Sequence, residues 1–96
     1  MPPKVERKLA AIMFTDIAGY TALSAKDEKK ALKLLDIQTE NIYPIIEEFE
    51  GTINKTVGDG LLITFPTVTA ALECGIKIQK VSKIFPDLNI RIGIHE

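Results

Sequence analysis

The chain has 96 residues, of which 46% are hydrophobic and 26% are charged, a balance typical of one small globular domain. Twelve basic and thirteen acidic residues leave a net charge of −1, so the composition gives no support for a nucleic-acid-binding protein. No apolar run approaches the roughly 20 residues that cross a bilayer, which argues against a membrane segment in this chain.

Two features of the sequence bear on the location of the protein: its N-terminus and its cysteine content. Residues 1–7 are rich in proline and charge, lack the apolar stretch of a signal peptide, and are expected to be a flexible N-terminus. Residues 8–96 are expected to form the domain. The single cysteine, Cys74, cannot form an internal disulfide, so we expect a reducing compartment and a cytoplasmic location.

The first predicted strand covers residues 9–15, which are almost wholly apolar and indicate a central strand buried on both faces. Asp16 closes this run, and a turn containing Gly19 follows. Ser24 and Asp27 then indicate the start of a helix, with Ser24 as its N-cap and Asp27 near its N-terminus.

A long amphipathic helix is predicted next, because apolar residues recur at steps of three and four from Ala31 to Phe49. Pro44 lies inside this pattern, where it removes one backbone hydrogen bond and crowds the preceding turn. We therefore expect a kink or a break near Asn41. Gly51 is expected to end the helix in the left-handed conformation.

The second half of the chain predicts two strands, a helix and a strand. Residues 52–57 and 61–65 alternate as strands, and the Gly58-Asp59 pair between them is a type II′ hairpin signal. After Pro66, Thr67 or Thr69 is expected to cap a helix that Pro86 ends. This helix carries an apolar stripe: Ala71, Cys74, Ile78, Val81 and Phe85. Residues 88–95 then alternate as a half-buried strand.

The element order predicts an α+β fold, a ferredoxin-like βαββαβ sheet with its helices on one face. Right-handed crossovers place the first and third strands in the middle of the sheet. In this topology Asp16, at the end of the first strand, and Asp59, in the hairpin turn, meet at the same end of the sheet. Alone, Asp59 is explained as a turn residue and Asp16 as a residue on the approach to a helix, but two converging carboxylates suit a divalent metal pair facing a nucleotide.

Other candidate residues are weaker. Gly19, before Tyr20 and Thr21, could let backbone N–H groups turn outward toward phosphate oxygens, although many such turns need a glycine for geometry alone. Lys55 is expected to share one face of its strand with Ile53 and Val57, an apolar stripe, and is either a charge that blocks edge pairing or a donor to a ligand. His95 has no partner histidine and is more simply a polar-face residue.

Three blocks in order resemble the class III nucleotidyl cyclases: FTDIAGYT (14–21), NKTVGDG (54–60) and RIGIH (91–95). The resemblance covers essentially the whole chain. It implies an adenylyl cyclase reaction, in which the 3′-hydroxyl of ATP attacks the α-phosphate and gives cyclic AMP and pyrophosphate. It also implies a site formed between two catalytic domains, so that a head-to-tail homodimer is the expectation.

The resemblance also implies site residues. Asp16, Asp59 and the backbone carbonyl of Ile17 match the ligands of two Mg²⁺ or Mn²⁺ ions. Gly19, Tyr20 and Thr21 match the turn that holds the β- and γ-phosphates. Lys55 matches the purine-selecting position, where lysine goes with adenine; in the dimer it would face the two aspartates of the partner.

The chain departs from the family by stopping after RIGIH, so it resembles only the N-terminal half of the catalytic domain. The second purine contact and the asparagine and arginine that stabilise the transition state have no counterpart. We therefore expect this chain alone to be inactive or very weak. Apolar surface left open by the absent part predicts self-association, as a homodimer or a strand-exchanged oligomer.

The residues leave three other hypotheses for the function. A non-catalytic ferredoxin-like dimerisation or interaction module would keep the fold without binding ATP. A diguanylate-cyclase or polymerase palm shares the sheet but would carry a different hairpin from the Val-Gly-Asp-Gly found here. An RNA-binding sheet would need a basic surface and sheet-face aromatics, which six aromatic residues and a net charge of −1 do little to support.

Overall fold

The computed structural model describes residues 10–96, and the predicted flexible segment 1–7 lies outside the described residues. The elements follow in the order β1 (Ala11–Ile17), α1 (Tyr20–Lys26), α2 (Glu28–Asn41), α3 (Tyr43–Glu48), β2 (Thr52–Val57), β3 (Gly60–Phe65), α4 (Val68–Ser82) and β4 (Ile90–His95). The strands form one sheet in the order β2-β3-β1-β4, with every neighbouring pair antiparallel. The ferredoxin-like topology, with the first and third strands in the middle, is confirmed.

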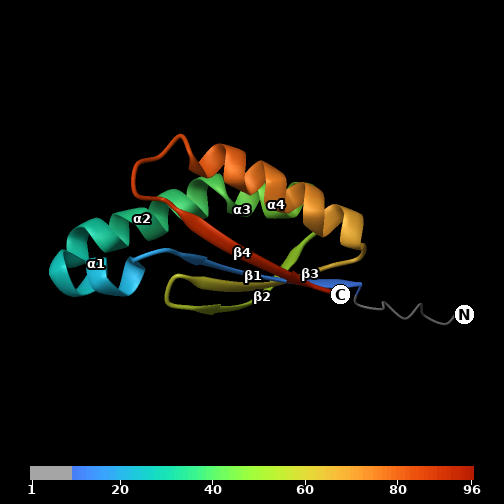
Figure 1. Cartoon of the computed structure of the whole chain (residues 1–96), viewed down its shortest axis with the longest axis horizontal. Helices are drawn as coiled ribbons and strands as arrows, with labels where there is room; N and C mark the ends of the chain where they lie inside the picture. The colour runs from blue at the N-terminus through green and yellow to red at the C-terminus, as the bar shows by residue number, and fades with distance from the viewer. Residues whose placement is uncertain (1–9) are drawn as a thin grey trace, which may run out of the picture.

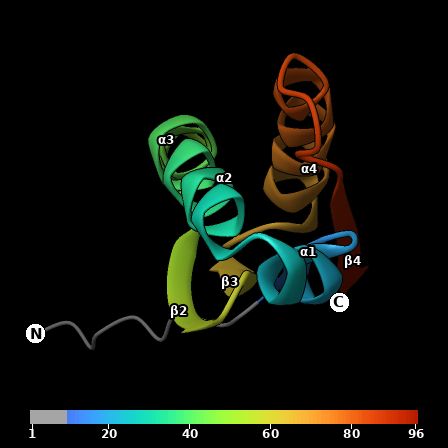
Figure 2. The same cartoon turned by 90° about the vertical axis from the view of Figure 1, so that its left-hand side faces the viewer.

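The helices and the sheet form two layers. Figures 1 and 2 show α2 and α3 in one stack and α4 in a second, both on the same side of the sheet. In the described part of the chain no helix covers the opposite face. The prediction that β1 is buried on both faces is therefore wrong: β1 is central, but its burial alternates, and Phe14 on the bare face is 49% exposed.

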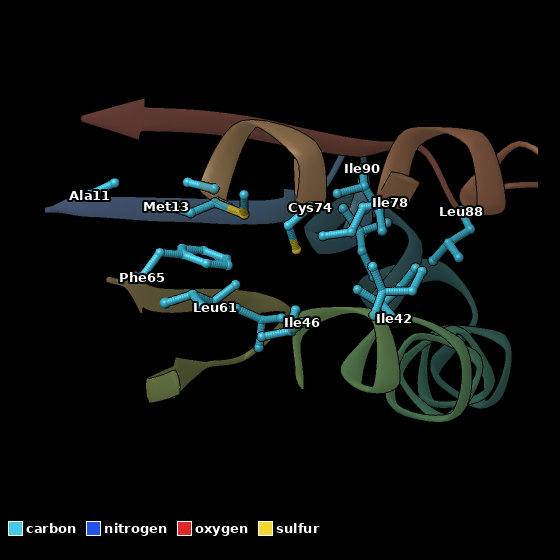
Figure 3. Close-up of a cluster of buried hydrophobic side chains, with 14 of the residues drawn as sticks. Ala11, Met13, Ile42, Ile46, Leu61, Phe65, Cys74, Ile78, Leu88 and Ile90 are labelled. Carbon is cyan, nitrogen blue, oxygen red and sulfur yellow. The ribbon is translucent and has the colours of Figure 1, made fainter. Parts of the chain in front are cut away.

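The core lies between these two layers. Met13 of β1 lies beside Cys74 of α4 in Figure 3, and Phe65 of β3 and Ile78 of α4 belong to the same buried cluster. Ile46 of α3 adds to this cluster from the stack formed by α2 and α3. Burial raises the pKa of the Cys74 thiol to about 11, in keeping with a core role for this cysteine. None of the helices within residues 10–96 has the length and apolar character needed to cross a membrane.

The start of the long helix differs from the prediction. Ser24 lies inside α1, a separate short helix, and the N-cap of α2 is Asp27, whose carboxylate accepts a hydrogen bond from the Lys30 N–H at 3.1 Å. The predicted break is confirmed, because α2 ends at Asn41 and α3 begins at Tyr43 with Pro44 in its first turn. In that first turn a proline costs little, since its missing N–H would have had no helical partner.

The residue that leaves α3 in the left-handed conformation is Glu50, with φ of 63°, and not Gly51 as predicted. Gly51 is needed for a different reason, which is close packing. A Cβ added there would lie 2.7 Å from the Phe65 ring and 2.8 Å from Ile46 Cγ2. The glycine therefore lets the chain pass directly against the core as it enters β2.

The second long helix begins as predicted and ends earlier. The Thr67 hydroxyl accepts a hydrogen bond from the Ala70 N–H at 3.0 Å, which makes it the N-cap of α4. The helix ends at Ser82, and the chain then tightens into turns in which Phe85 N–H donates to the Ser82 carbonyl. Phe85, which the stripe placed on the helix, still packs against the core from this turn.

Candidate functional site

The structure brings the two predicted aspartates together. Asp16 is the last residue but one of β1, at the strand end where it was predicted, and the strand continues one residue further to Ile17. Asp59 occupies the two-residue loop between β2 and β3, where Val57 pairs with Gly60. Oδ2 of Asp59 accepts a hydrogen bond from the Ile17 N–H at 2.7 Å, so its carboxylate lies directly beside the residue after Asp16.

The hairpin turn explains how Asp59 reaches this position. Gly58 has φ of 59°, whereas Asp59 has no positive φ, and this pattern of signs is that of a type II′ turn. The bond to Ile17 then ties the tip of the β2–β3 hairpin to the end of β1. Asp59 is therefore held by its own backbone turn and by a second strand, which fixes its carboxylate at the end of the sheet.

Asp16 forms an ion pair with Arg91, a residue for which no role was predicted. Arg91 of β4 is its direct partner in the sheet register, and the guanidinium donates from Nε to Oδ1 at 2.7 Å and from Nη2 to Oδ2 at 2.9 Å. These hydrogen bonds hold the pKa of Asp16 below its usual value. They also raise the pKa of Arg91, and the nearby charge of Asp59 acts in the same direction.

Lys55 lies on the face of the sheet that no helix within residues 10–96 covers, but the prediction that it shares this face with Ile53 is wrong. A β-bulge between Ile53 and Lys55 shifts the register of β2 against β3. As a result Ile53 pairs with buried Ile63 and packs on the core, while Lys55 pairs with Leu62 on the bare face. Lys55 therefore shares a face with Val57 and not with Ile53.

The bare face of the sheet carries a row of residues from all four strands. Lys55 pairs with Leu62, Leu62 with Phe14, and Phe14 with Gly93. The ion pair Asp16–Arg91 lies one row further toward the hairpin turn. Together with Asp59 these side chains line a hollow of about 690 Å³, a size that suits a nucleotide-sized ligand.

The predicted phosphate turn lies outside the lining of this hollow. Gly19, with φ of 77°, precedes α1, and Tyr20 and Thr21 are the first two residues of that helix. Tyr20 packs partly against the core, and Thr21 is exposed. The turn therefore follows directly after Asp16 and Ile17 at the end of β1, but the side chains of the turn do not line the hollow.

The donor set can be tested against the implied metal ions. Within residues 10–96 no three or more His, Cys, Asp or Glu side chains gather as a metal site. Asp16 and Asp59 supply two carboxylates that open onto one hollow. Mg²⁺ is commonly held by one or two carboxylates, with water and phosphate oxygens as its other ligands. The residues therefore fit Mg²⁺ or Mn²⁺ bound together with a nucleotide, and do not fit a closed structural metal site.

Two curated proteins are similar to the chain in sequence, whereas no family model matches it. "Putative adenylate cyclase 3" of Rhizobium meliloti is 34% identical over 77 residues, which are 79% of this chain and 13% of that protein. "Serine/threonine-protein kinase pkn2" of Myxococcus xanthus is 27% identical over 92 residues, which are 88% of this chain and 11% of that protein. The chain therefore spans only a small part of the length of either relative.

Solved structures of cyclases share the fold. The guanylyl cyclase Cya2 is 27% identical, with a TM-score of 0.77 over 93% of this chain and 54% of that one. The adenylyl cyclase CyaB from P. aeruginosa is 28% identical, with a TM-score of 0.77 over 88% of this chain and 53% of that one. The chain spans about half the length of these structures. Fold, sequence blocks and similarities together show that this chain belongs to the class III adenylyl and guanylyl cyclase family.

Proposed function

We propose that this chain is part of an adenylyl cyclase catalytic domain, its N-terminal half, which contributes the metal-binding and purine-binding groups. The observation that carries the proposal is convergence: Asp16, Asp59, Lys55 and Arg91 come from different elements and line one hollow. The full reaction would convert ATP to cyclic AMP and pyrophosphate. Such a reaction depends chiefly on positioning and on charge stabilisation, and these are the properties that this set of side chains can supply.

Each group has a distinct part in this proposal. Asp16, Asp59 and the Ile17 carbonyl would hold two Mg²⁺ or Mn²⁺ ions, whose chemistry is to acidify the attacking 3′-hydroxyl and neutralise phosphate charge. The bond from Ile17 N–H keeps Asp59 aimed at the hollow before any ligand binds. Gly19, Tyr20 and Thr21 would present backbone N–H groups to the β- and γ-phosphates. Lys55 would contact the adenine of a nucleotide held by the two aspartates of a partner copy.

The chain alone is proposed to be inactive or very weak in turnover. It spans about half of the solved cyclase structures. By the family resemblance, the asparagine and arginine that stabilise the transition state have no counterpart within these 96 residues. Loss of even one preorganised charge-stabilising donor costs about 10²–10³ in rate. Binding of substrate and metal is therefore a more direct test of this chain than formation of product.

The proposal is tested by calorimetric titration of ATP into the chain in the presence of Mn²⁺. We expect binding that requires the metal and that needs both Asp16 and Asp59. A folded chain that binds no ATP with Mn²⁺ would contradict the proposal. It would favour the non-catalytic interaction module, in which the cyclase blocks are retained without the activity.

Lys55→Glu is expected to lower the preference for ATP over GTP. The exposed ammonium at position 55 can donate to a purine acceptor, whereas a carboxylate can only accept and would favour a purine that offers donors. A competition titration between ATP and GTP with Mn²⁺ gives the affinity ratio, which should fall about tenfold, the effect of one charged hydrogen bond. An unchanged ratio would return Lys55 to the role of a charge that protects the edge strand.

A second copy of the chain is proposed as a partner. β4 is an edge strand, and beside it a groove of about 450 Å³ runs along α4, with Leu72 50% and Ile76 58% exposed. An edge next to exposed apolar side chains is prone to pair with another chain. Light scattering after size exclusion is expected to show a dimer or larger species, with Ile76→Lys shifting it toward monomer. A monomer at all concentrations would contradict self-association.

A further inference from the structure

The ion pair between Arg91 and Asp16 uses the whole of the Asp16 carboxylate. Nε and Nη2 of the guanidinium each reach a different oxygen, at 2.7 and 2.9 Å, in the two-pronged geometry that makes such pairs specific. The carboxylate expected to bind metal therefore already has a cationic partner. Nothing in the sequence blocks indicates this, because Asp16 and Arg91 are 75 residues apart.

A divalent cation and the guanidinium cannot share this carboxylate without cost. Mg²⁺ takes carboxylate oxygens at about 2.1 Å, and its remaining ligands need space around it. Arg91 lies over the same two oxygens, and like charges a few ångströms apart repel. Asp59 does not relieve the conflict fully, because one of its oxygens is already bound to the Ile17 N–H.

The arginine is free to leave at little structural cost. The Arg91 side chain is 70% exposed and that of Asp16 is 42% exposed, so their separation uncovers no core surface. Arg91 also lines the hollow that we assign to the nucleotide. A polyphosphate anion there offers the guanidinium a second two-pronged partner of equal chemical quality.

We propose that Arg91 is an exchangeable counter-ion of the metal site, which occupies Asp16 when the site is empty and yields it when a metal–polyphosphate complex binds. This inference rests on the proposed function. Its consequence is that metal alone binds weakly, whereas metal and polyphosphate strengthen each other's binding. By linkage the strengthening is equal in both directions.

The test is a titration of Mn²⁺ alone into the chain, with free Mn²⁺ measured by electron paramagnetic resonance. Arg91→Gln removes the competing cation and is expected to raise Mn²⁺ affinity about three- to tenfold, as expected for loss of an exposed ion pair and its nearby charge. Lys55→Gln is the matched control, because it removes one positive charge from the same hollow without touching Asp16. We expect it to change the affinity less than Arg91→Gln.

A second titration adds inorganic triphosphate as the probe anion. In the parent chain triphosphate should raise the apparent Mn²⁺ affinity, beyond the complex that forms in solution, and Arg91→Gln should lose most of that gain. Unchanged or weaker Mn²⁺ binding by Arg91→Gln, or an equal effect from Lys55→Gln, would overturn the inference. Mn²⁺ binding that ignores Asp16→Asn and Asp59→Asn would instead overturn the metal site itself, so the two failures are distinguishable.

Discussion

Asp59→Asn is expected to abolish Mn²⁺-dependent ATP binding while the chain stays folded. The asparagine side chain keeps an oxygen that can accept the hydrogen bond from the Ile17 N–H, now 2.7 Å long, and asparagine is well tolerated in turns. Only the negative charge is lost. Because a hard divalent cation depends on that charge, ATP affinity with Mn²⁺ should fall by at least about tenfold.

The measurement is calorimetric titration with ATP and Mn²⁺, beside circular dichroism of the same samples. Asp36→Asn is the control, because Asp36 is an exposed aspartate on α2 that does not line the hollow. It should bind as the parent does. If Asp59→Asn binds ATP and Mn²⁺ with unchanged affinity, and its helical signal is intact, Asp59 is a turn residue and nothing more.

The topology could be predicted from sequence because its causes are local. Alternating apolar residues identify the strands, and the Gly58-Asp59 turn permits only a tight antiparallel hairpin. Pro44 breaks the long helix where a missing N–H and a crowded carbonyl require it. The handedness of crossovers then decides the order of the strands. The meeting of Asp16 and Asp59 follows from topology alone.

The surroundings of Lys55 could not be read from alternation, because a bulge changes the parity of β2. The two-residue turn pairs Val57 with Gly60, and an unbroken register would place Ile53 on the bare face. The bulge returns Ile53 to the core opposite Ile63. Burial of an isoleucine thus offsets the lost ladder pairing. The bulge could have been predicted by combining the register set by the hairpin turn with the apolar pattern of β3.

The partner of Asp16 was missed for a different reason. Arg91 and Asp16 are opposite each other only because β1 and β4 pair with one particular register, and no short turn sets that register. It depends on the long connection through α4 and on packing of Ile90 and Leu88 in the core. The positive charge of Arg91 therefore could not be matched to Asp16 until the register of β1 against β4 was known.

Gly51→Ala is expected to cost about 1–3 kcal/mol of unfolding free energy, the usual range for overpacking a core. The φ of Gly51 is not positive, so alanine strains no backbone angle and the effect is one of packing alone. Its Cβ would lie 2.7 Å from the Phe65 ring and 2.8 Å from Ile46, both only 1% exposed. Neither side chain can move into solvent, because both are enclosed by the helix layer and the sheet.

The cost appears as a lower thermal midpoint, by roughly 10 °C for a domain of this size, or as a lower urea midpoint with an unchanged slope. Gly93→Ala is the matched control. A Cβ there meets nothing within 4 Å, so unfolding free energy should change by less than about 0.5 kcal/mol. Equal stability of Gly51→Ala and the parent would mean that β2 enters the sheet further from Phe65 than the structure places it, and the position of the β2–β3 hairpin would need revision.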